Sequence, residues 1–121
     1  RVETAQGEVV PGSVFEATRY KTAMRPETAA TVRDLMVEVV NNGTGTRAQI
    51  PGIQVAGKTG TAQVEGNDAP HAWFIGFAPA EAPRYAVAVL VENGGDLGSE
   101  ATGGRVAAPI AAEVLKALLQ P

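Results

Sequence analysis

The spacing of apolar residues predicts a helix over residues 25–42. Apolar side chains recur there every three or four positions, which is typical of a helix with one apolar face. The stripe consists of Val32, Leu35, Met36, Val39 and Val40. Pro26 suits the first turn, although Arg25 before it is a poor N-cap. Gly43 follows the last turn, so we expect it to adopt the left-handed cap conformation that ends many helices.

Three strand-like runs follow at residues 53–64, 72–78 and 85–91, separated by predicted turns at 65–70 and 79–83. Because these connections are short, an antiparallel meander is expected. The second and third runs are apolar on both faces, whereas a solvated antiparallel sheet has polar residues on one face. We therefore expect a sheet that is covered on both sides. In such a sheet Trp73, which shares a face with Ile75 and Phe77, would lie in the core.

A C-terminal helix that ends near Leu119 supplies one cover for this sheet. Apolar residues repeat along it every four positions and predict its buried face: Val106, Ile110, Val114 and Leu118. Pro109 would kink this helix unless it lies in the first turn. Residues 1–24 predict a small hairpin that turns at Gly7, followed by a loop. The expected fold class is α+β, an antiparallel three-stranded portion of a larger sheet with one helix before it and one packed on it.

Composition excludes several function classes. The chain has 121 residues, of which 45% are hydrophobic, so it is a globular domain or a large piece of one. Its net charge is -3 with both signs interspersed, so no nucleic-acid partner is expected. Cysteine is absent, which excludes disulfides and thiol catalysis. His71 is the only histidine and has no partners for a metal site or a triad, so we interpret it as structural or solvated and expect no metal and no cofactor.

Two further features concern the chain as a whole. No apolar run approaches the ~18 residues that a membrane helix requires. The first residue is Arg1 rather than methionine, which indicates a processed or excised piece of a longer protein. That interpretation also accounts for the sheet face that the first helix is too small to cover.

Residues 52–59 match the phosphate-loop pattern G-x-x-x-x-G-K-T, and residues 87–92 form an apolar run that ends in an acid. A phosphate loop must follow a buried strand and open a helix, since the helix N-terminus holds the phosphates. Residues 47–51 do not resemble a buried strand, and residues 60–66 have no helical period. A P-loop nucleotide-binding fragment is therefore the weaker alternative, and it would require a helix at residues 60–68.

The same segment fits an edge strand beside a cleft. Gly60 has no side chain, so a ligand can approach the strand closely and pair with its backbone. The hydroxyls of Thr59 and Thr61 fall on one face and can donate to a ligand carboxylate. Lys58 points to the opposite face by alternation and would add positive potential from beneath the edge. The simpler alternative is a surface strand with a solvated lysine.

Five segments resemble, in order, the C-terminal part of the transpeptidase domain of class B penicillin-binding proteins. Residues 27–43 fit the helix before the K-T-G strand, and residues 50–63 look like that strand. Residues 71–79 and 86–95 resemble the family's next two strands. Residues 107–110 resemble the start of its closing helix. Together these motifs cover most of residues 20–120.

The resemblance implies a serine D,D-transpeptidase that cross-links peptidoglycan stem peptides and is acylated by β-lactams. Lys58 would support the electrostatics of the cleft, while Thr59, Gly60 and Thr61 would bind the substrate or the β-lactam carboxylate. The backbone N–H of Thr61 would supply one arm of the oxyanion hole. The parent would be membrane-anchored on the extracytoplasmic face of the bacterial cytoplasmic membrane, where it would join cell-wall synthesis complexes.

This sequence lacks two motifs that the family's active site requires, Ser-x-x-Lys and Ser-x-Asn. Its only serines are Ser13 and Ser99, which are followed three residues later by Glu16 and Thr102. We therefore expect a chain that begins after the nucleophile, that is inactive alone, and that needs the missing N-terminal part of the domain as its partner. A non-catalytic module that binds peptides or β-lactams is the second alternative.

Overall fold

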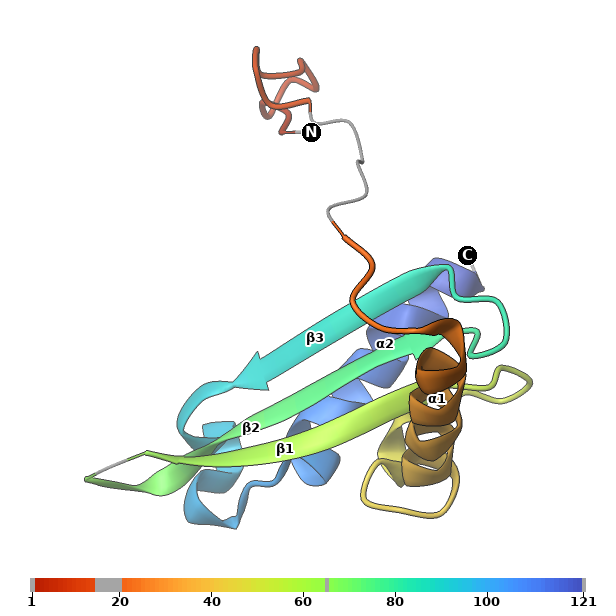
Figure 1. The fold of residues 1–121 in the computed structure, drawn as a ribbon. Helices are drawn as coiled ribbons and strands as arrows, with labels where there is room; N and C mark the ends of the chain where they lie inside the picture. Colours follow the sequence, from red (N-terminus) through yellow and green to blue (C-terminus); the bar gives the residue numbers. More distant parts are fainter. Residues whose placement is uncertain (1, 15–20, 65, 121) are drawn as a thin grey trace.

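A computed structural model describes residues 2–14, 21–64 and 66–120 (Figure 1). Three antiparallel strands form one sheet in the order β1-β2-β3, so the predicted α+β class and meander are confirmed. The main elements are α1 (Pro26–Asn41), β1 (Ala56–Val64), β2 (Asn67–Ala78), β3 (Tyr85–Val91) and α2 (Ala108–Leu119). Shorter elements are 3₁₀ segments at Thr46–Ala48 and Glu92–Glu100 and a π-helical turn at Gly103–Ala107.

The β1–β2 hairpin is longer than the sequence predicted. β2 begins at Asn67, so the turn predicted at residues 65–70 is too long. Pairing reaches from Ala56 to Val64, with an irregularity of register near the tip that brings Val64 opposite Asn67. Pro70 lies inside β2 and is fully buried, although proline is usually excluded from strand interiors.

Helix α1 begins at Pro26 as predicted, and Arg25 makes no side-chain cap. The prediction that Gly43 adopts a left-handed conformation is wrong, because its φ is not positive. The helix ends at Asn41, and the next residue, Asn42, caps it through its N–H, which donates to the carbonyl of Glu38 at 2.9 Å. Gly43 is required for a different reason, since a side chain there would lie 3.0 Å from the backbone of Val39.

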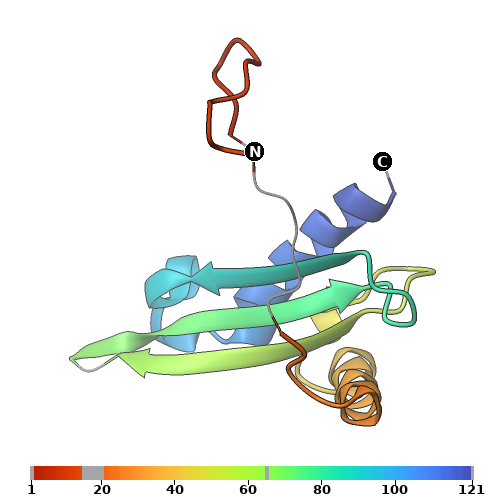
Figure 2. The same cartoon turned by 45° about the horizontal axis from the view of Figure 1, so that its top comes forward.

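Helix α2 covers one face of the sheet, but with a different side of the helix from the one predicted (Figure 2). Ile110 and Leu118 from the predicted stripe are 46% and 44% exposed, whereas Leu115 is fully buried. Small residues form the rest of the buried side: Ala107, Ala108, Ala111 and Ala112. The predicted stripe is therefore wrong. Alanines let the helix lie close to the sheet, where the ring of Phe74 already fills the central space. Pro109 lies in the first turn of α2, as required.

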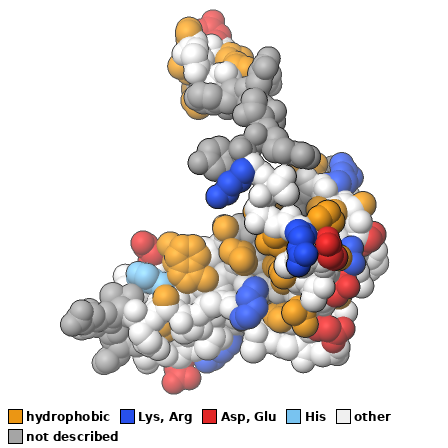
Figure 3. Space-filling model, in the orientation of Figure 1, with side chains coloured by type: hydrophobic (Ala, Val, Ile, Leu, Met, Phe, Trp, Pro, Cys, Tyr) orange, Lys and Arg blue, Asp and Glu red, His pale blue; other side chains and the backbone are white. Residues whose placement is uncertain are grey.

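The other face of the sheet is largely open. Trp73 is 39% exposed and Ile75 is 50% exposed, so the predicted burial of Trp73 is not found in this structure. Helix α1 covers only the end of this face near Phe77, through Met36 and Val37. Figure 3 shows apolar side chains gathered over the strands on this face. The part of the chain that the structure describes thus leaves a large apolar surface exposed, which is unusual for a complete domain.

The hairpin predicted near the N-terminus is present. Glu3 pairs with Val9, and Gly7 has a φ of 83°, which suits the turn. The Ser13 hydroxyl accepts the N–H of Val2 at 3.0 Å and donates to its carbonyl at 3.1 Å. No helix among the described residues has the length and hydropathy of a membrane span.

Candidate functional site

The residues predicted to bind ligand lie together on β1, the edge strand of the described sheet. β1 pairs only with β2, so its other edge is free along the described strand. Lys58 and Gly60 lie opposite Ile75 and Trp73, on the open face. Thr59 lies opposite Phe74 on the face that α2 covers, and Thr61 follows on the same side. The prediction of an edge strand is therefore confirmed.

This geometry contradicts a phosphate-binding loop. Residues 57–64, which would have to open a helix, form an extended strand instead. Residues 58–64 continue as strand and open no helix, so their backbone N–H groups cannot converge on a phosphate. The nucleotide-binding alternative is wrong.

Lys58 shows which backbone groups of β1 face the free edge. Its Nζ donates to the carbonyl of Thr59 at 2.7 Å, as expected for a carbonyl that faces the free edge. The N–H and C=O of a strand residue point to the same edge, and the direction alternates from residue to residue. The backbone N–H of Thr61 therefore also faces the free edge.

The packing around Gly60 also indicates that the backbone N–H of Thr61 faces the free edge. A Cβ built on Gly103 would lie 2.6 Å from the carbonyl oxygen and 2.9 Å from the nitrogen of Gly60, and it would overlap the carbonyl oxygen of Trp73. The backbone groups of Gly60 and its partner Trp73 thus gather around one point, as they do in a pair that exchanges hydrogen bonds. Since Gly60 faces β2, the adjacent Thr61 faces away from it.

The two threonine hydroxyls have different surroundings. Thr59 Oγ1 lies 2.6 Å from Thr44 Oγ1, and either hydroxyl can donate. Thr61 is exposed, and its hydroxyl has no hydrogen-bond partner among the described residues. The edge therefore presents one hydroxyl fixed by a neighbour and one that is open to a ligand.

The glycine-rich region at residues 92–104 contains two kinds of structural glycine. Gly94, Gly95 and Gly98 have positive φ, which explains them without phosphate binding. Gly103 and Gly104 instead allow the π-helical turn to lie directly against β1. Sequence reasoning missed this second role, although two adjacent glycines just before an apolar helix are a signal of close packing.

His71 has a structural role, as interpreted from the sequence. Its Nδ1 accepts the backbone N–H of Asn93 at 3.0 Å, which joins β2 to the start of the glycine-rich segment. Asn93 has a φ of 50°, so this bond holds a residue in a conformation that few side chains adopt.

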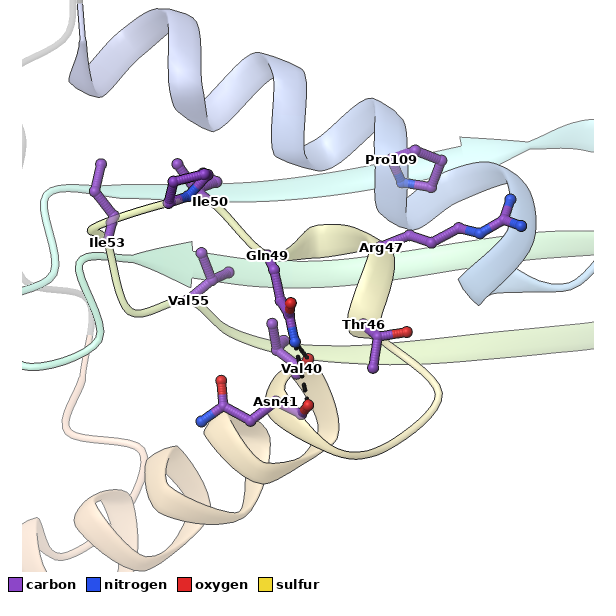
Figure 4. Close-up of a pocket in the computed structure, with 10 residues that line it drawn as sticks. Val40, Asn41, Thr46, Arg47, Gln49, Ile50, Ile53, Val55 and Pro109 are labelled. Carbon is purple, nitrogen blue, oxygen red and sulfur yellow. Dashed lines mark hydrogen bonds between the residues drawn. The ribbon is translucent and has the colours of Figure 1, made fainter.

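A cavity of about 680 Å³ lies between the end of α1 and the start of α2 (Figure 4). Two of its polar side chains, those of Gln49 and Arg47, have structural partners. Gln49 Nε2 donates to the carbonyls of Val40 and Asn41, at 3.0 and 3.1 Å, at the end of α1. Arg47 Nη1 donates to the carbonyl of Arg105 at 3.1 Å. No side chain of residues 58–61 lines this cavity, so it is separate from the candidate site.

Comparisons with known proteins identify the family of this chain. Residues 3–116 match the family model described as the penicillin-binding protein transpeptidase domain. The chain belongs to this family. It is 53% identical over 108 residues to the peptidoglycan D,D-transpeptidase PbpA of Mycobacterium tuberculosis, which covers 84% of this chain and 21% of that protein. Identity to PbpA of Mycolicibacterium smegmatis is 50% over 124 residues, covering 98% of this chain and 25% of that protein.

Solved transpeptidase structures have the same arrangement of elements. An acyl-enzyme complex of M. tuberculosis penicillin-binding protein A superposes with a TM-score of 0.72 at 50% identity, over 84% of this chain and 23% of that one. The D,D-transpeptidase domain from Eggerthella lenta has a TM-score of 0.67 at 42% identity, over 96% of this chain and 25% of that one. The chain thus spans about a fifth to a quarter of the length of these relatives.

Proposed function

We propose that this chain, residues 1–121, is the C-terminal portion of a transpeptidase domain and supplies the substrate-binding strand of a serine D,D-transpeptidase. The parent cross-links peptidoglycan stem peptides on the extracytoplasmic face of the bacterial cytoplasmic membrane, to which it is anchored, within cell-wall synthesis complexes. The observation that carries the proposal is the free edge of β1 in a chain of this family, with a lysine and two threonines at that edge.

The edge suits an extended peptide or a β-lactam whose carboxylate is close to the reacting carbonyl. The ligand backbone pairs with β1 beside Gly60. Thr59 and Thr61 donate their hydroxyls to the carboxylate, and Lys58 adds positive potential. The N–H of Thr61 points at the oxygen on which negative charge develops, where one such donor increases the rate by roughly 10²- to 10³-fold.

The nucleophile must come from another part of the protein. Ser13 is bonded through its hydroxyl to both backbone groups of Val2, and Ser99 is exposed within the segment Glu92–Glu100. Neither has a lysine three residues later, and an unactivated serine hydroxyl is a weak nucleophile. The chain alone is therefore inactive. Its partner is the rest of the transpeptidase domain, for which the open face around Trp73 and Ile75 provides an apolar docking surface.

Two substitutions of Thr61 in the full-length protein test these roles separately. Thr61→Val removes the hydroxyl and keeps the N–H, so it should slow acylation by carboxylate-bearing β-lactams by roughly ten- to a hundredfold, through loss of a charge-assisted hydrogen bond. Thr61→Pro removes the N–H as well, at an edge position where a proline costs no ladder bond. Its acylation by a fluorescent penicillin should fall by a further factor of roughly 10² to 10³.

The same assay separates the proposal from a non-catalytic binding module. The full-length protein should form a covalent adduct that survives denaturation, whereas a binding module would release the ligand. Equal acylation of the Val and Pro variants would contradict the assignment of the Thr61 N–H to the oxyanion hole.

A further inference from the structure

We propose that Thr44 is a positioning residue that orients the Thr59 hydroxyl toward the ligand carboxylate. This inference rests on the proposed function of β1. Thr44 lies in the loop after α1, fifteen positions before Thr59, and the two Oγ1 atoms are 2.6 Å apart. Nothing in the sequence pattern indicates this pairing, because the two residues meet only when the loop passes the free edge of β1.

The backbone on both sides of Thr44 is fixed by one carbonyl. The carbonyl of Val39 accepts the N–H of Gly43 at 3.1 Å and the N–H of Gly45 at 2.9 Å. Both glycines lie close to the last turn of α1, where a side chain at Gly45 would approach the Val39 oxygen to 3.2 Å. The loop is therefore held tightly against α1, and Thr44 projects from a fixed position.

The π-helical turn before α2 holds Thr44 from the opposite direction. A Cβ built on Gly104 would overlap the carbonyl oxygen of Thr44 and would lie 3.8 Å from the Cγ2 methyl of Thr59. Both threonines therefore abut the same short piece of backbone. Three elements that are distant in sequence, the α1 loop, β1 and the turn before α2, thus meet at this pair of hydroxyls.

The chemistry of two hydroxyls beside an anion determines the direction of donation. Each hydroxyl has one proton, and a carboxylate can only accept. When a carboxylate binds Thr59, the Thr59 proton must point at it, so Thr44 becomes the donor to Thr59 Oγ1. A chain of donors that ends on an anion polarises each bond and strengthens the last one. Thr44 thus acts through Thr59 and does not itself contact the ligand.

The test measures acylation of the full-length protein by benzylpenicillin and by its methyl ester, which has no carboxylate. Thr44→Val removes one neutral hydrogen bond, so the acylation efficiency for benzylpenicillin should fall about two- to twelvefold, with the ester changed by less than about twofold. Thr44→Ser keeps the hydroxyl and should restore the wild-type value. Thr46→Val is the matched control, because Thr46 lies in the same loop, is exposed and has no side-chain hydrogen bond among the described residues.

A double-mutant cycle supplies the readout that a purely structural role would not produce. In a Thr59→Val background the added Thr44→Val should have no further effect, because the hydroxyl that it orients is gone. Thr44→Ala, which lacks the hydroxyl and adds no bulk, replaces the Val variant if the latter does not fold. Equal slowing of both ligands, failure of Thr44→Ser to restore the rate, or multiplicative effects in the cycle would each overturn the inference.

The outcomes also separate this inference from the function on which it rests. If neither ligand acylates the wild-type protein, the proposed function is wrong and the positioning role falls with it. If benzylpenicillin acylates the wild-type protein and Thr44→Val behaves as the wild type does, only the role of Thr44 is refuted.

Discussion

Gly103→Ala should destabilise the fold, because a methyl group at this position has no space. The new Cβ would overlap the carbonyl oxygen of Trp73 and would lie 2.6 and 2.9 Å from the oxygen and nitrogen of Gly60. All three atoms belong to the backbone of paired strands, so no side chain can rotate out of the way. The turn before α2 would have to move away from the sheet.

That displacement determines the expected magnitude. Forcing an extra carbon into a packed interior costs typically about 1–3 kcal/mol, and the upper end applies where backbone must move. Lifting the start of α2 would also loosen Ala107 and Ala108, which are fully buried behind Gly103. We therefore expect a loss of about 3 kcal/mol, a large share of the roughly 5–15 kcal/mol of a typical domain.

Urea unfolding followed by the fluorescence of Trp73, the only tryptophan, measures this loss directly. Gly60→Ala is the matched control, because its Cβ would meet only the Trp73 Cβ, at 3.3 Å. The control should lose less than about 1 kcal/mol. Equal midpoints for Gly103→Ala and the wild type would refute the close packing of the turn against β1.

Three further predictions concern other parts of the molecule. Leu115→Ala should lower the free energy of unfolding by about 2–5 kcal/mol in the same urea assay, whereas Leu118→Ala, at an exposed position, should lower it by less than about 1 kcal/mol. The reverse order would show that the buried side of α2 is misassigned. In the full-length protein, Thr59→Val should slow acylation by carboxylate-bearing β-lactams by roughly ten- to a hundredfold through loss of a charge-assisted hydrogen bond, and unchanged kinetics would remove Thr59 from the site. The isolated chain should self-associate through its open apolar face, on which Ile75 is 50% exposed, so Ile75→Lys should shift it toward the monomer in sedimentation velocity. An unchanged distribution of species would exclude that face from self-association.

Local patterns predicted several elements correctly because their causes are local. β3 has the predicted bounds, Tyr85–Val91, since a run rich in β-branched residues is enclosed by a proline-containing turn and a glycine-rich segment. The edge position of β1 followed from its polar and glycine-containing alternation beside an apolar neighbour. The candidate binding residues, proposed from one contiguous motif, all lie on β1.

Other features depend on contacts between distant segments and could not be read from periodicity. The buried side of α2 was misassigned because pattern reasoning favours large apolar residues, whereas the distance to Phe74 favours alanine. The exposure of Trp73 was missed because an apolar face indicates that a cover is needed, not where that cover lies in the sequence. Thr44 and Gly104 reach the binding strand only through the folded loop and turn, so no spacing rule includes them.

On the function proposed above, this chain provides the binding strand and another part of the protein provides the nucleophile. Intact-mass spectrometry after incubation with excess benzylpenicillin tests it most directly, on the 121-residue chain and on the full-length protein in parallel. We expect one covalently bound drug molecule on the full-length protein, at a serine outside this chain, and an unchanged mass for the chain alone. A stable adduct on the chain, localised to Ser13 or Ser99, would contradict it.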